Sequence, residues 1–103
     1  MLLSPFRVIN IVPKGKIKKT EETRMWARGT IDFETEDGRN TVVRYSVEHF
    51  DEPSIWGYRK GKASRIWLKQ DSRVVYNFDR GEDVKPQTEE AKESLKLLLK
   101  KYN

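Results

Sequence analysis

The chain has 103 residues, a length that predicts one domain spanning residues 1–103 with a core of modest size. Its 21 lysine and arginine residues exceed its 16 aspartate and glutamate residues. The resulting net charge of +5 favours an anionic partner such as nucleic acid or an acidic protein surface. The absence of cysteine excludes disulfide bonds, zinc–thiolate sites and thiol nucleophiles.

The N-terminal quarter predicts one strand followed by a basic loop. Residues 6–12 are rich in β-branched apolar side chains, which favour a strand, and Pro13 ends the run. Residues 14–23 carry four lysines around Gly15 and are typical of a loop. We therefore expect the next strand to begin near residue 24.

Residues 24–35 and 41–49 predict a hairpin, because apolar and polar side chains alternate in both and Asp37-Gly38 between them is a turn signal. A two-residue turn would set the apolar face of one strand opposite the polar face of the other. We therefore predict a three-residue loop or a bulge. The predicted cross-strand pairs are Phe33–Val43, Ile31–Tyr45, Asp32–Arg44 and Arg28–Glu48.

Residues 64–70 and 73–79 predict a second hairpin around Asp71-Ser72, again with a three-residue loop. Residues 50–63 join the two hairpins and hold one proline and two glycines, which indicate irregular backbone. The predicted pairs of the second hairpin are Leu68–Val74, Ile66–Tyr76 and Trp67–Val75.

Pro86 and Thr88 predict the start of a C-terminal helix. Strands followed by one helix predict an α+β fold: an antiparallel β-sheet, a meander of hairpins with four to five strands, and one C-terminal α-helix packed on one face. The apolar face of the helix comprises Ala91, Leu95, Leu98, Leu99 and Tyr102. The predicted core between sheet and helix comprises Phe33, Tyr45, Ile66, Leu68, Tyr76, Leu95 and Leu98.

Few residues suggest catalysis. His49, the one histidine, falls on the inward face at the end of its strand, where a structural role is favoured over that of a general base. Glu48, Asp51 and Glu52 could join it around a hard cation. Adjacent strand residues point to opposite faces, however, so a solvated turn is favoured. Phosphate-binding loops, dinucleotide fingerprints and nucleophile elbows are absent from the sequence. We expect no enzymatic activity, no cofactor and no metal.

Large aromatic side chains interleave with arginine and lysine over residues 56–80, a pattern that suits stacking on bases and neutralising phosphates. The favoured site is the loop at residues 50–65, with single-stranded nucleic acid as the partner. The alternative is a protein-interaction module, such as a modulator of a host protein. The candidate binding residues are Trp26, Trp56, Tyr58, Arg59, Lys60, Lys62, Arg65 and Trp67.

The sheet face directed away from the helix is a second place where tryptophans gather. Trp26 and Trp67 would lie there as a stacking platform, but the predicted Asp32–Arg44 and Arg28–Glu48 pairs would leave the face nearly neutral. Equally favoured is a small apolar cluster covered by the N-terminal segment or by residues 50–63. That cluster would comprise Trp26, Val42, Trp67 and Val75.

Residues 61–81 (GKASRIWLKQDSRVVYNFDRG), followed by a helix that ends in KKYN, resemble a group of small uncharacterised phage and prophage proteins of Gram-positive bacteria. The resemblance covers the C-terminal half, and the chain departs from the group at Glu82, where a large aromatic is expected. It implies an accessory role in a bacterial cytoplasm and no established activity. The order of strands and helix is also similar to transcriptional-coactivator and Whirly-type single-stranded-DNA-binding domains, by topology alone.

Membrane association is not indicated. No apolar run approaches the roughly 20 residues that a helix needs to cross a bilayer, and the first residues lack the pattern of a signal peptide. We therefore expect a cytoplasmic protein without a membrane partner, and the sequence leaves its oligomeric state open.

Overall fold

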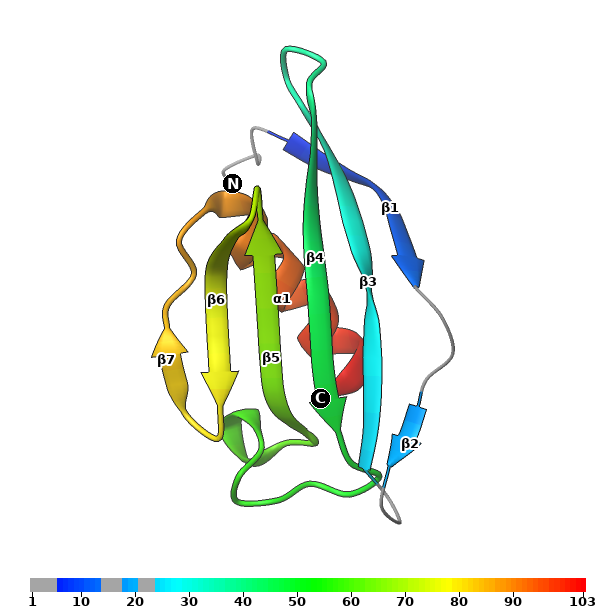
Figure 1. Cartoon of the computed structure of the whole chain (residues 1–103), viewed down its shortest axis with the longest axis vertical. Helices are drawn as coiled ribbons and strands as arrows, with labels where there is room; N and C mark the ends of the chain where they lie inside the picture. The colour runs from blue at the N-terminus through cyan, green and yellow to red at the C-terminus, as the bar shows by residue number, and fades with distance from the viewer. Residues whose placement is uncertain (1–5, 14–17, 21–23) are drawn as a thin grey trace.

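The computed structural model describes residues 6–13, 18–20 and 24–103. Within them, seven strands form one antiparallel sheet, and a single α-helix lies across one face (Figure 1). The strand order is β1-β3-β4-β5-β6-β7, and the short β2 also pairs with β3. The strands are β1 (Phe6–Pro13), β2 (Lys18–Thr20), β3 (Arg24–Thr35), β4 (Asn40–His49), β5 (Ala63–Gln70), β6 (Arg73–Asp79) and β7 (Glu82–Val84); the helices are η1 (Tyr58–Lys60, 3-10) and α1 (Glu89–Tyr102).

The predicted α+β class, the antiparallel meander and the C-terminal helix are confirmed. The predicted count of four to five strands is too low, because β2 lies in the predicted basic loop and β7 lies in a segment for which no strand is predicted. Each of these strands has only three residues, too few for an alternating pattern to show in the sequence.

The core lies between the sheet and α1, and all seven residues predicted for it belong to its buried cluster. Thr88 caps the helix, since its hydroxyl accepts a hydrogen bond from the backbone N–H of Ala91 at 3.0 Å. Leu95 and Leu98 are 7% and 2% exposed. Leu97 falls off the predicted apolar stripe, yet it is partly buried and packs against the same cluster.

The β3–β4 hairpin pairs two residues away from the predicted register. Ile31 lies opposite Val43, because the backbone N–H of Thr35 donates to the carbonyl of Arg39 at 2.8 Å and closes a loop over residues 36–38. Gly38 ends that loop at φ 83°, a left-handed conformation that glycine adopts without steric cost. The three-residue loop is confirmed and the four predicted pairs are wrong. A shift of two residues leaves each side chain on its predicted face.

The β5–β6 hairpin has a two-residue turn instead of the predicted three-residue loop. Asp71 and Ser72 both adopt left-handed backbone angles, with φ 50° and 63°, as a tight hairpin turn requires. The register then shifts between Leu68 and Lys69, which leaves Val75 as an extra residue on β6. The observed pairs are Leu68–Tyr76, Trp67–Asn77 and Ile66–Phe78, so the three predicted pairs are wrong.

Candidate nucleic-acid interface

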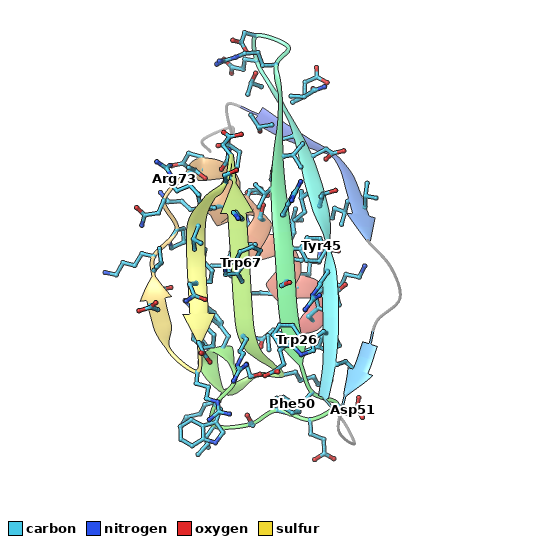
Figure 2. The ribbon with its side chains drawn as sticks, in the orientation of Figure 1. Trp26, Tyr45, Phe50, Asp51, Trp67 and Arg73 are labelled. Atoms are coloured by element: carbon cyan, nitrogen blue, oxygen red, sulfur yellow. The ribbon has the colours of Figure 1, made fainter. Side chains whose placement is uncertain are left out.

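The sheet face opposite α1 carries Trp26 and Trp67, which lie on β3 and β5, on either side of β4 (Figure 2). Strand alternation places them there, because Ala27 next to Trp26 and the two neighbours of Trp67 are buried on the helix side. Both tryptophans are half-buried. Of the proposed second apolar cluster, Val75 instead joins the main core and Val42 is 45% exposed. The cluster is therefore not formed as predicted, and its N-terminal cover involves residues outside those the structure describes in full.

A hollow of about 300 Å³ separates the two indoles. On the strand between them Ser46 pairs with Trp67 on one side and with Arg28 on the other, so a small side chain stands where a larger one would fill the space. Asn77 lines the β6 side of the hollow. The hollow therefore offers indole surface together with hydrogen-bonding groups.

Each indole has a cation beside it. The guanidinium carbon of Arg28 lies 5.7 Å from the ring centroid of Trp26, and Nζ of Lys69 lies 5.7 Å from that of Trp67. Arg44 is exposed on the strand between them. In the part of the chain that the structure describes, these three side chains make no ion pair. We call Trp26, Trp67, Arg28, Arg44 and Lys69 the tryptophan platform.

Both charge pairs predicted for this face are wrong, because the register differs from the predicted one by two residues. Asp32 lies opposite Val42, and Arg44 lies opposite Thr30. Glu48 lies opposite Trp26 and bonds elsewhere. Arg28 and Arg44 therefore lack the acidic partners predicted for them, while the charged residues on the face stay the same.

Arg65 bridges two carboxylates at the lower end of the platform. Its Nε lies 3.1 Å from Oδ1 of Asp79 and 3.6 Å from Oε1 of Glu48. Glu48 is 2% exposed, and the hydroxyl of Ser64 donates to its Oε1 at 2.8 Å. Arg65, a candidate for contacting phosphate, is thus already engaged in an internal network.

The 50–65 loop places its predicted aromatic residues in different environments. Trp56 is 54% exposed, whereas the Tyr58 ring packs edge-on against Phe78 at 5.1 Å and belongs to the rim of the core. Gly57 approaches Gly61 so closely that a Cβ at Gly57 would lie 1.8 Å from the Gly61 carbonyl oxygen. The close approach of Gly57 and Gly61 therefore shapes the loop, and of Trp56 and Tyr58 only Trp56 is exposed. The loop cations Arg59, Lys60 and Lys62 are exposed.

A second hollow, of about 410 Å³, lies under the same loop, and we call it the lower pocket. Its lining comes from the end of β4, from the loop and from the β6–β7 turn, so no local sequence signal could have assembled it. Figure 2 shows Phe50 and Asp51 at this end of the sheet. The lining residues are Glu48, Phe50, Asp51, Glu52, Ser54, Trp56, Ser64 and Arg80.

A family model described as a domain of unknown function (DUF7678) matches residues 25–103. The chain belongs to this family. The matched part of the DUF7678 domain begins in β3 and includes the tryptophan platform, the lower pocket and α1. No curated protein and no solved structure matches the chain. The family description states no activity, and the resemblance to phage and prophage proteins stays a prediction.

His49 of the DUF7678 domain lies on the inward face, where it is 9% exposed and its ring stacks 4.9 Å from that of Tyr102. Burial lowers the pKa of His49, and its Nε2 has no hydrogen-bond partner. Glu48 next to it faces the opposite side of the sheet. Among the described residues, no group of three or more His, Asp or Glu side chains is arranged to hold a metal ion, and no helix is long and apolar enough to cross a membrane.

Proposed function

We propose that this DUF7678 domain binds single-stranded nucleic acid on the tryptophan platform. Trp26 and Trp67 stack with bases, while Arg28, Arg44 and Lys69 contact phosphates. The observation that carries the proposal is the pair of half-buried indoles flanking a hollow, each with a cation beside it that has no ion-pair partner among the described residues. A stacked base contributes about 1–3 kcal/mol in such sites, without regard to its identity.

The platform supports this role better than the 50–65 loop does. Tyr58 packs on Phe78, and Trp56 lines a pocket that also holds three carboxylates, which repel phosphate. Arg59, Lys60 and Lys62 remain candidates for outer phosphate contacts, because all three are exposed. The binding surface proposed here is therefore the open sheet, with the loop at its edge.

The test of stacking is the fluorescence anisotropy of a labelled oligothymidylate titrated with protein at low salt. Trp67→Ala should weaken binding about 5- to 150-fold, since the loss of one stacked base costs about 1–3 kcal/mol. Trp56→Ala is the matched control, because it removes a more exposed indole from outside the platform. Equal affinity of the wild type and Trp67→Ala would contradict the proposal.

The test of phosphate contact is the salt dependence of the same affinity. Three phosphate contacts on a single strand predict a slope of about −2 in log Kobs against log salt, and Arg28→Gln with Lys69→Gln should flatten it. Lys96→Gln, on the exposed side of α1, is the control. Equally tight binding of polyglutamate would instead indicate an acidic protein surface as the partner.

A further inference from the structure

The lower pocket differs in charge from the rest of the molecule. The chain has a net charge of +5, yet the lining of this pocket contains three carboxylates and one guanidinium. Phe50 and Trp56 supply aromatic walls. A hollow of about 410 Å³ with such walls and an excess of negative charge is complementary to an organic cation.

A cationic side chain of the protein itself, Arg80, already packs against an aromatic wall of the pocket. The guanidinium carbon of Arg80 lies 5.8 Å from the ring centroid of Trp56. Arg80 is held there by its backbone, since its φ is 59° and its N–H donates to the carbonyl of Ser64 at 3.0 Å. Trp56 remains 54% exposed, so the indole has surface left for a second cation.

The walls of the pocket are held in place by the backbone of the loop. Phe50 N–H donates to the carbonyl of Lys62 at 3.0 Å, and Ser54 N–H donates to that of Gly61 at 3.1 Å. The hydroxyl of Ser54 accepts from the backbone N–H of Trp56 at 3.2 Å. These bonds fix Phe50 and Trp56 relative to the end of β4, so the pocket exists before a ligand arrives.

Glu48 lies at the floor of the pocket, and its carboxylate pairs with Arg65. It is 2% exposed and is held by Ser64 and Arg65, so it cannot turn away into solvent. Asp51 and Glu52 are exposed at the mouth and can contact a ligand directly. The carboxylates available to a cation therefore lie at the mouth, where Asp51 and Glu52 can bind it through charge-assisted hydrogen bonds.

We propose that the lower pocket binds a guanidinium or ammonium group, stacked on Trp56 and paired with Asp51 and Glu52. Two sources carry this chemistry: an arginine or lysine side chain of a partner protein, and a free polyamine. The proposal is independent of nucleic-acid binding, because it uses none of the tryptophan platform. It assigns the exposed tryptophan of the loop to a cation and not to a base.

The first test is titration with N-acetyl-arginine-amide, followed by tryptophan fluorescence at low salt, with N-acetyl-glutamine-amide as the uncharged control. A saturable change with the cation alone is expected, and Trp56→Ala should abolish it. Glu52→Gln should weaken binding about two- to fivefold, the range for one exposed cation contact. No difference between the two amides would overturn the proposal.

Arg80→Gln gives the sharpest discrimination, because it removes the cation that already occupies the Trp56 ring. Binding of the arginine amide should tighten about two- to fivefold in this variant. Weaker binding would mean that Arg80 helps to form the ligand site instead of competing with a cation for Trp56, which would overturn the proposal. Trp67→Ala should leave binding of the arginine amide unchanged. Failure of cation binding in the lower pocket can therefore be distinguished from failure of oligonucleotide binding on the tryptophan platform.

The source of the cation is resolved by comparing spermidine with an arginine-containing and a lysine-containing peptide in the same titration. Peptides that bind more tightly than spermidine support a partner protein, and the reverse order supports a polyamine. In either case the Trp56→Ala variant should lose binding of the ligand, which shows that the ligand binds in this pocket. Binding of all three ligands that survives this substitution would overturn the proposal.

Discussion

At the scale of single residues, Glu48 and His49 show how two adjacent side chains acquire separate roles. Both are nearly buried, but strand alternation sends Glu48 to the open face and His49 to the helix face. Glu48 gains Ser64 and Arg65 as partners. His49 gains the ring of Tyr102 and no hydrogen bond at Nε2. The carboxylate therefore joins a polar network, whereas burial lowers the pKa of His49 and favours its neutral ring.

The environment of His49 makes a prediction about pH. Burial lowers its pKa below the ordinary 6.5; Asp51 opposes the shift and Lys62 adds to it. The unfolded chain then takes up the proton first as pH falls. The contribution of His49 is complete above about pH 6.5 and is lost as pH falls through the folded-state pKa. Urea unfolding at pH 7.5 and 5.5 should show a smaller loss of stability in His49→Gln than in the wild type. Equal losses would contradict it.

At the scale of elements, the turns decide which residues meet and the alternation decides which face they occupy. The loop at residues 36–38 and the two-residue turn at Asp71-Ser72 each give their hairpin a register that differs from the predicted one. The first shift leaves Arg28 and Arg44 without the acidic partners expected for them. A change in register at one end of a hairpin thus alters which charged side chains meet many residues away.

The packing of α1 makes a prediction about stability. Leu95 is 7% exposed and belongs to the core cluster. Leu95→Ala should lower the free energy of unfolding by about 2–5 kcal/mol, through lost apolar burial and the cavity left behind. Lys96→Ala, one position along on the exposed side, should change it by less than half a kilocalorie. A comparable effect of the two substitutions in denaturant unfolding would show that α1 does not pack as described.

At the scale of the whole molecule, one sheet carries two surfaces of opposite character on the side away from α1. The tryptophan platform presents cations with no ion-pair partner in the described chain, and the lower pocket presents carboxylates. The Glu48–Arg65–Asp79 network lies between them, since Arg65 and Asp79 line the platform hollow and Glu48 lines the pocket. This separation lets two ligands of opposite charge bind one small domain.

The extent of the core makes a prediction about truncation. Among the side chains that the structure describes, the buried cluster runs from Ile31 to Leu98, and Ile11 of β1 packs against it. A protein of residues 25–103 should therefore fold, with a loss of stability that includes about 1–2 kcal/mol from the contact of Ile11. Its β3 edge would be open to pairing with other chains, so size-exclusion chromatography should show association. A disordered circular dichroism spectrum would show instead that β1 is required for the fold.

The sequence by itself determined the class of fold, the order of β1, β3, β4, β5, β6 and α1, and the face of the seven predicted core side chains. These follow from local periodicity, which a strand or helix imposes residue by residue. The sequence did not determine the face of Val75, which a bulge in β6 directs into the core. Only the tertiary structure decided the register, because positive φ angles at Gly38 and Asp71 set the turns. It also decided the sites. Trp26 and Trp67 were predicted as a pair, but their free cations and the lower pocket arise where segments distant in sequence meet, and no local pattern records that meeting.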